Sequence, residues 1–164
     1  MTELVYWEDT YLGSLDGATV ESIEEHEGKE GMEYCTVLDK TIFHPQGGGQ
    51  PSDSGVITAN GVEFNVSMVR KDGETVKHYG NFTNGGPDQL PKGSKVALQI
   101  NLDDRRLYAR IHSAGHLLDA AVQNLGLQLE PGKGYHFPNS PFVEYKGTIP
   151  PSDRNDIKTK LNDG

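Results

Sequence analysis

Residues 55–80 restrict the possible folds more than any other stretch of this chain. Asn60-Gly61 and Asp72-Gly73 separate runs in which apolar and polar residues alternate. Asn-Gly and Asp-Gly pairs accept the positive φ angles of tight hairpin turns, so each pair predicts two neighbouring antiparallel strands. Three further runs have strand-like composition: 18–26, 33–38 and 94–102. Short, closely connected strands of this kind predict a small antiparallel β-barrel or sandwich.

A helical period replaces the alternation after residue 102. Asn101 and Asp104 form a capping pair at the start of the region, and Gly126 supplies the stop. Five apolar residues fall on one face of a helix: Leu107, Ile111, Leu118, Val122 and Leu125. The pattern predicts a helix from Asp103 to Leu125.

The residues after this helix indicate a second structural unit. Two strand-like runs, at 133–137 and 142–149, predict a hairpin, and 150–161 contains the start of another helix. A helix, a hairpin and a helix in this order are typical of the beginning of an α+β domain. We therefore predict an α+β chain, with a β-barrel domain over 1–102 and an incomplete α+β domain over 103–164.

The overall charge argues against a protein that binds nucleic acid tightly and without specificity. The formal net charge is -9 at pH 7, whereas phosphate binding uses clustered Lys and Arg. Arg105, Arg106 and Arg110 form a local basic stretch and are candidates for RNA phosphate contact. The alternative is that they are solvated charges on a helix face.

Three features predict a cytoplasmic protein without membrane contact. No apolar run is long enough to span a bilayer, and the first ten residues lack the basic start and apolar core of a signal peptide. The single Cys35 cannot form an internal disulfide, which agrees with a reducing compartment.

A histidine pair lies within the predicted helix. His112 and His116 are four residues apart, so their imidazoles share one face and can bind one metal ion, with Asp119 orienting a ring. Gly115 is unfavourable in mid-helix, which predicts that another group approaches the backbone there. The alternative is a pair of half-buried structural rings. Zinc needs further ligands, and two other histidines are the remaining donors: His44 and His136.

A glycine-rich motif, TIFHPQGGGQPSDSG, occupies residues 41–55. Three consecutive glycines permit positive φ angles and the close approach of a ligand or another backbone. Gln46, Gln50 and Asp53 place hydrogen-bonding groups beside them. Such a loop either presents backbone N–H groups to an anion or carbonyl, or is a tight barrel loop fixed by Pro45 and Pro51.

Together the two motifs resemble one known family. The glycine motif, followed by RIHSAGHLLDAAV at residues 110–122, is similar to the editing domain of alanyl-tRNA synthetase and to its freestanding relatives, the AlaX proteins. This is the second additional domain shared by threonyl- and alanyl-tRNA synthetases. The resemblance covers most of the chain.

The resemblance implies a hydrolase that acts in trans on tRNA. The expected substrate is alanine tRNA that wrongly carries serine or glycine, and the expected cofactor is Zn²⁺ held by His112 and His116. Zinc then either activates a water or binds the amino group of the substrate. The resemblance also places amino-acid discrimination in the glycine motif: Gly47, Gly48, Gly49, Gln50 and Thr41.

One part of the family pattern is missing. The family completes its zinc site with a downstream CxxxH motif, and the sequence reaches Gly164 before such a motif. We expect a fragment, a truncated gene product or a descendant that lost this part, with poor zinc affinity if nothing follows. Two other functions stay open: a non-catalytic module that binds tRNA or a protein, and a hydrolase of small aminoacyl esters.

Overall fold

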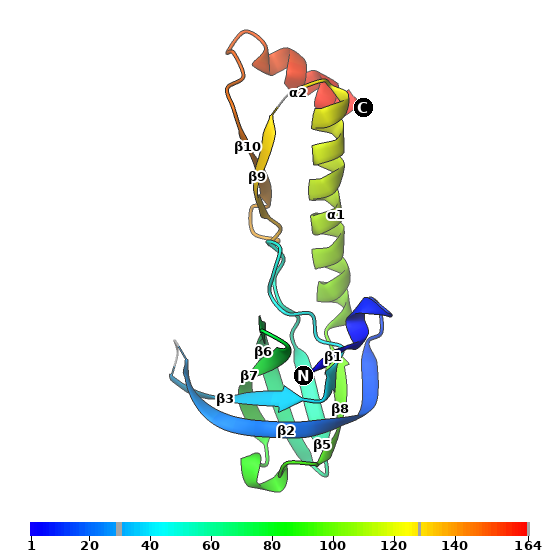
Figure 1. Cartoon of the computed structure of the whole chain (residues 1–164), viewed down its shortest axis with the longest axis vertical. Coiled ribbons are helices and arrows are strands. Elements are labelled where there is room, and N and C mark those ends of the chain that lie inside the picture. The colour runs from blue at the N-terminus through cyan, green and yellow to red at the C-terminus, as the bar shows by residue number, and fades with distance from the viewer. Residues whose placement is uncertain (29–30, 128, 164) are drawn as a thin grey trace. The chain divides into compact units, whose positions relative to one another are not determined.

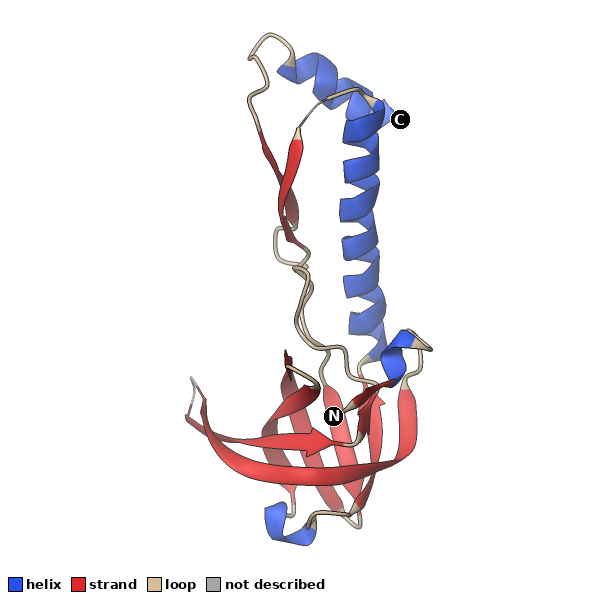
Figure 2. Cartoon of the chain, in the orientation of Figure 1, coloured by secondary structure: helices blue, strands red, loops and turns tan. Residues whose placement is uncertain are grey.

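The computed structural model describes residues 1–28, 31–127 and 129–163, and the chain divides into two compact units (Figure 1). The first unit comprises residues 1–47 and 51–106. The second comprises Gly48–Gln50 and residues 107–164. The predicted α+β class is confirmed, because the described residues form a large antiparallel sheet and two α-helices (Figure 2).

The first unit is mostly strands. Its elements, in chain order, are β1 (Glu3–Leu4), the 3-10 helix η1 (Val5–Trp7), β2 (Ser14–Gly28), β3 (Gly31–Leu38), β4 (Lys40–Thr41), β5 (Gly55–Ala59), β6 (Val62–Asp72), β7 (Thr75–Asn84), the 3-10 helix η2 (Pro87–Gln89), β8 (Lys95–Ile100) and the first turn of α1 (Leu102–Asn124). The strand-like runs at 18–26, 33–38 and 94–102 correspond to β2, β3 and β8.

Six of these strands pair in an order that returns to its start, β2-β3-β7-β6-β5-β8, with β8 hydrogen-bonded to β2. All of these pairs are antiparallel. Asn60 and Gly61 connect β5 to β6 with φ angles of +50° and +79°, as a primed two-residue turn requires. The prediction of a hairpin at this dipeptide is confirmed.

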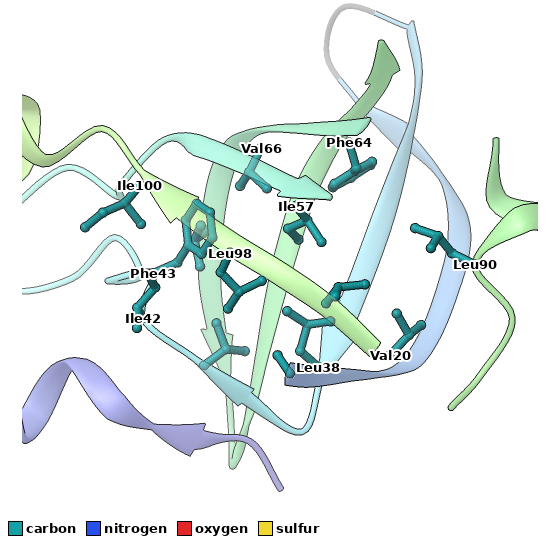
Figure 3. Close-up of a cluster of buried hydrophobic side chains, with 14 of the residues drawn as sticks. Val20, Leu38, Ile42, Phe43, Ile57, Phe64, Val66, Leu90, Leu98 and Ile100 are labelled. Atoms are coloured by element: carbon teal, nitrogen blue, oxygen red, sulfur yellow. The ribbon is translucent and has the colours of Figure 1, made fainter. Parts of the chain in front are cut away.

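The core of the first unit lies inside the closed strand order (Figure 3). On β6, Val62, Phe64 and Val66 are buried and the residues between them are exposed, so every second side chain points inward. A register shift between Val66 and Met68 then brings Val69 inward. The same cluster takes buried side chains from other strands and loops: Val20, Leu38, Ile42, Phe43, Ile57, Leu90, Leu98 and Ile100.

The helix α1 begins and ends where its capping residues predict. Asn101 Oδ1 accepts the Asp104 N–H at 3.3 Å, and Gly126 follows the helix with φ +70°. Its apolar stripe is only partly buried among the described residues, because Leu118 is exposed whereas Val122 is buried.

The rest of the second unit is a hairpin and a short helix. The strands β9 (Glu130–Tyr135) and β10 (Phe142–Lys146) pair antiparallel, and the helix α2 spans Arg154–Asp163. The predicted hairpin and second helix are therefore confirmed. In the described part of the chain, neither α-helix is long and apolar enough to cross a membrane.

Candidate functional site

The helix α1 brings His112 and His116 together, as their spacing predicts. Their ring centroids are 5.0 Å apart and the ring planes differ by 25°. His112 Nδ1 lies 2.9 Å from Gln50 Oε1. Because an amide oxygen only accepts, Nδ1–H donates this bond and Nε2 carries the lone pair.

The second histidine has a similar neighbour. His116 Nδ1 lies 3.7 Å from Asp119 Oδ2, a residue one turn further along α1. Metal-binding histidines usually have one ring nitrogen beside a carboxylate or carbonyl oxygen, which fixes the nitrogen that faces the metal. Gln50 and Asp119 occupy such positions at His112 and His116.

The glycine motif contributes Gly48–Gln50 to the second unit. Gly48 and Gly49 have φ angles of +56° and +79°, which a residue with a side chain rarely adopts. A Cβ atom at Gly48 would lie 3.6 Å from His112 Cε1, so the loop backbone runs close to this ring. The two glycines thereby place the buried Gln50 side chain on His112.

Thr41, another residue of the glycine motif, lies in the core of the first unit. It belongs to the first unit and is fully buried, where its hydroxyl lies 2.8 Å from His78 Nε2 and accepts the Phe43 N–H at 3.1 Å. These hydrogen bonds stabilise the core of the first unit, and a role of Thr41 in amino-acid discrimination remains a prediction. Gly47 also belongs to the first unit and is exposed.

His44, one of the two spare histidines, also belongs to the first unit. Its ring packs edge-on against Tyr6 with centroids 5.2 Å apart, and its Nδ1 is buried without a hydrogen-bond partner among the described residues. Burial lowers the pKa of His44. A neutral ring in this setting has the character of a core side chain.

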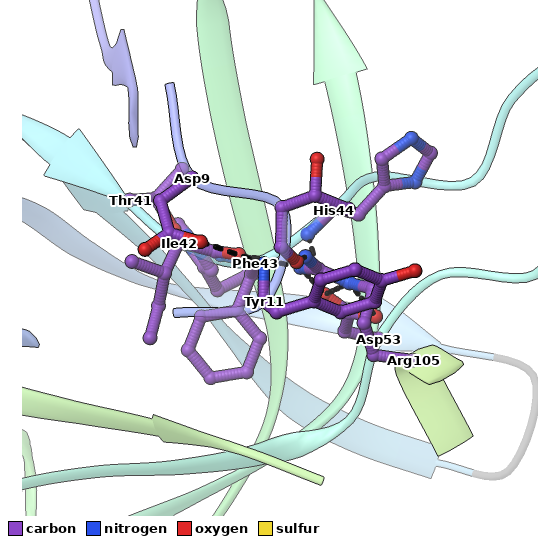
Figure 4. Close-up of polar contacts among 10 residues, drawn as sticks. Asp9, Tyr11, Thr41, Ile42, Phe43, His44, Asp53 and Arg105 are labelled. Atoms are coloured by element: carbon purple, nitrogen blue, oxygen red, sulfur yellow. Dashed lines mark hydrogen bonds and ion pairs between the residues drawn. The ribbon is translucent and has the colours of Figure 1, made fainter. Parts of the chain in front are cut away.

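Arg105 lies in the interior of the first unit (Figure 4). Its side chain is buried in the first unit, and Nε donates to the two carboxylate oxygens of Asp53 at 2.9 and 3.0 Å. The guanidinium also donates to the carbonyl oxygens of Ile42 and Thr10. Because these partners surround it, Arg105 is not presented to RNA phosphates.

The other two arginines are exposed. Arg106 Nη1 lies 3.9 Å from Asp103 Oδ1, a distance typical of a weak surface ion pair. For Arg106 and Arg110, RNA contact remains a prediction.

Tyr145 is a site residue that sequence reasoning missed. Its hydroxyl, on β10, donates to Asp119 Oδ1 at 2.6 Å, so the carboxylate lies between Tyr145 and His116. Burial and the Asp119 carboxylate raise the pKa of Tyr145 to about 12, so the hydroxyl keeps its proton at neutral pH. No local pattern distinguishes this tyrosine, because its partner lies on another element.

The Tyr145→Phe variant is expected to lose about 1 kcal/mol of unfolding free energy, because a hydrogen bond to a partly exposed carboxylate is removed. Urea unfolding followed by circular dichroism measures the loss. Tyr11→Phe, which removes an exposed hydroxyl, is the control and is expected to change little. Equal stability of the two variants would contradict the assigned hydrogen bond.

The prediction of a close approach at Gly115 is confirmed. A Cβ atom there would lie 2.5 Å from His136 Cε1, well inside van der Waals contact. The histidine ring therefore occupies the space that any other residue at position 115 would fill. His136 follows β9 and its N–H donates to Gly49 O at 2.8 Å.

The donor set fits part of a zinc site. His112 and His116 supply two imidazoles with oriented rings, and zinc accepts such ligands. Among the described residues, no group of three or more His, Cys, Asp or Glu is arranged to hold a metal ion. These residues thus fit as two of the ligands that a tetrahedral zinc ion requires.

Comparisons with known proteins agree with the sequence motifs. The family model "tRNA synthetases class II (A)" matches residues 2–104. The alanyl-tRNA editing protein AlaX-L of Pyrococcus horikoshii is 37% identical over 127 residues, which are 76% of this chain and 29% of that protein. AlaX-M of Methanosarcina barkeri is 36% identical over 140 residues, 79% of this chain and 53% of the relative.

An alanine–tRNA ligase, that of Halorhodospira halophila, is 38% identical over 110 residues, which are 67% of this chain and 12% of the ligase. The chain thus spans about half, or less, of the length of these relatives. The family model itself covers more than half of the chain. The chain therefore belongs to the class II (A) tRNA synthetase family, as an editing domain of the AlaX type.

Proposed function

We propose that this protein is a zinc-dependent aminoacyl-tRNA hydrolase that removes serine or glycine wrongly attached to alanine tRNA. The observation that carries the proposal is the histidine pair of α1, in which His112 Nδ1 faces Gln50 and His116 Nδ1 faces Asp119. Similarity to alanyl-tRNA editing proteins supports the choice of tRNA. A tRNA substrate is consistent with the cytoplasmic location that we propose.

The residues of the chain have separate roles in this proposal. His112 and His116 would hold the metal through their imidazoles. Gln50 orients the His112 ring by its hydrogen bond, and the Asp119 carboxylate lies near His116 Nδ1, at 3.7 Å. When bound, zinc supplies Lewis acidity, which lowers the pKa of water and polarises an ester carbonyl. The site acts on the ester bond between the amino acid and the ribose.

The glycine motif is assigned to the aminoacyl group. Gly48 and Gly49 lack side chains, so a ligand is able to approach their backbone closely. Gln50 carries two N–H donors in addition to the oxygen that faces His112, and we assign them to reading the amino acid.

The test measures hydrolysis of alanine tRNA that wrongly carries serine. The full chain is assayed in the presence of zinc, and the assay is repeated with a chelator added. His116→Ala is expected to lower the rate more than about 100-fold. Mutation of a residue that supports a metal ligand lowers activity about 10–100-fold, and loss of the ligand itself has a larger effect. The control is His26→Ala, which removes a half-exposed histidine of β2. It is expected to keep the wild-type rate.

Several outcomes would overturn the proposal. These are full activity of His116→Ala, full activity in the chelator, or tRNA binding by the wild type without hydrolysis. Equal rates on seryl-tRNA and on a small serine ester would replace the tRNA with a simpler substrate. Zinc content measured on the same preparations assigns any loss of activity to the metal.

A further inference from the structure

His136 is a buried histidine that takes no part in the proposed hydrolysis. Only 6% of the residue is exposed. Its ring is stacked on that of His112, with centroids 4.4 Å apart and planes that differ by 16°. The ring of His116 is further away, at 6.4 Å, and tilted by 40°. His136 therefore touches one member of the histidine pair face to face.

Three glycines make room for this ring. A Cβ atom at Gly115 would lie 2.5 Å from His136 Cε1, and one at Gly134 would lie 2.6 Å from Nε2. At Gly49 a Cβ atom would lie 3.2 Å from Cδ2 and would overlap the Gly134 carbonyl oxygen. The glycines come from α1, β9 and the glycine motif, so His136 is enclosed by three separate segments of the second unit.

Two of the contacts of His112 restrict different motions of its ring. The hydrogen bond from Nδ1 to Gln50 Oε1 fixes the tautomer and the direction of the ring within its plane. Stacking on His136 restricts rotation out of that plane. Together these two contacts restrict the His112 ring in different directions.

We propose that His136 is a positioning residue of the editing site, which clamps His112 in one orientation and one tautomer. The link to metal binding rests on the proposed function, in which His112 is a ligand. The clamp itself depends on the contacts of His112 with His136 and Gln50 and on the three glycines around His136. A five-membered ring suits the position, because Gly115 and Gly134 leave little space around its edge.

The first experiment measures the His112 tautomer in metal-free full-length protein by imidazole ¹⁵N NMR. In the wild type we expect the Nδ1–H form alone. In His136→Ala we expect a mixture of the two tautomers, because the ring gains freedom to leave Gln50. A single Nδ1–H form in this variant would overturn the proposal.

Gly115→Ala provides a variant that keeps His136 and displaces its ring. It is expected to give the same mixture of tautomers, whereas the control Ser113→Ala, at an exposed position of the same helix, is expected to give the wild-type spectrum. Circular dichroism on each sample establishes that the compared proteins are folded. A wild-type spectrum from folded Gly115→Ala would also overturn the proposal.

The second experiment titrates Co²⁺ as a spectroscopic substitute for zinc. His136→Ala and Gly115→Ala are expected to bind it about tenfold more weakly than the wild type, as other losses of outer contacts do. In hydrolysis, kcat is expected to fall while KM for the tRNA stays unchanged. Unaltered affinity in both variants would remove the positioning role.

Failure of the clamp and failure of the proposed function give different results. If the wild type binds no Co²⁺ and hydrolyses no aminoacyl-tRNA, the proposed function is wrong. The tautomer measurement still decides whether His136 holds His112, because it requires neither metal nor substrate.

Discussion

Replacing Arg105 by alanine is expected to lower the free energy of unfolding of the first unit by about 3–5 kcal/mol. The guanidinium neutralises the buried Asp53 carboxylate and donates to the carbonyl oxygen of Ile42 at 2.6 Å. Removal leaves an uncompensated charge, since both residues are buried. Urea unfolding followed by far-ultraviolet circular dichroism gives the change directly.

Arg106→Ala is the matched control for this prediction. Arg106 is the next residue on the same helix, but its side chain is exposed and its nearest carboxylate is 3.9 Å away. Its loss is expected to cost less than about 1 kcal/mol. If Arg105→Ala unfolds at the same urea concentration as Arg106→Ala, the buried ion pair does not stabilise the sheet as we infer.

Lowering the pH from 7 to 4 is expected to cost about 3 kcal/mol of stability through His78 alone. Burial lowers the pKa of His78 from 6.5 to about 4 in the folded protein. Below pH 6.5 His78 is protonated in the unfolded chain but stays neutral in the folded chain. The stability that is present at neutral pH is therefore lost progressively down to pH 4. Urea midpoints measured across this range provide the curve.

Burial keeps His78 neutral, and its hydrogen bonds define the tautomer of the neutral ring. Nδ1 donates to the Thr36 carbonyl oxygen at 3.0 Å, and Nε2 accepts from the Thr41 hydroxyl at 2.8 Å. The control is His78→Gln, which does not titrate and is expected to show a shallower loss between pH 6.5 and 4. Burial also lowers the pKa of His44. Because His44 is present in both proteins, subtracting the His78→Gln curve from the wild-type curve removes the contribution of His44 to the pH dependence. Identical slopes would assign the acid sensitivity to other groups.

Local sequence signals predicted most of the elements because their causes are local. Asn60-Gly61 defined a hairpin turn through the φ angles that these residues accept. The helix α1 followed from its cap at Asn101 and its stop at Gly126. The interpretation of Gly115 as a point of close approach was also confirmed, although the approaching residue could not be named.

The partners of charged and polar groups could not be predicted in the same way. An arginine in the first turn of a helix, such as Arg105, is usually expected to be exposed to solvent. Its partner Asp53 is 52 positions away in the sequence, so no local pattern indicates the pair. His136 has no ligand-like spacing, and its contact with His112 depends on how the hairpin folds beside α1. Such pairings are set by tertiary packing, which a single sequence encodes without a local signal.

Gly48–Gln50 belongs to the second unit although the chain on both sides of it belongs to the first. A genetic crossover near residue 106 would therefore take Gly48–Gln50 from one parent and most of α1, which these residues contact, from the other. A chimaera built in this way would combine one parent's Gln50 with the other parent's His112. For this protein, the interval from Gly48 to Tyr145 is the smallest block that recombination transfers with the histidine site and its supporting residues whole.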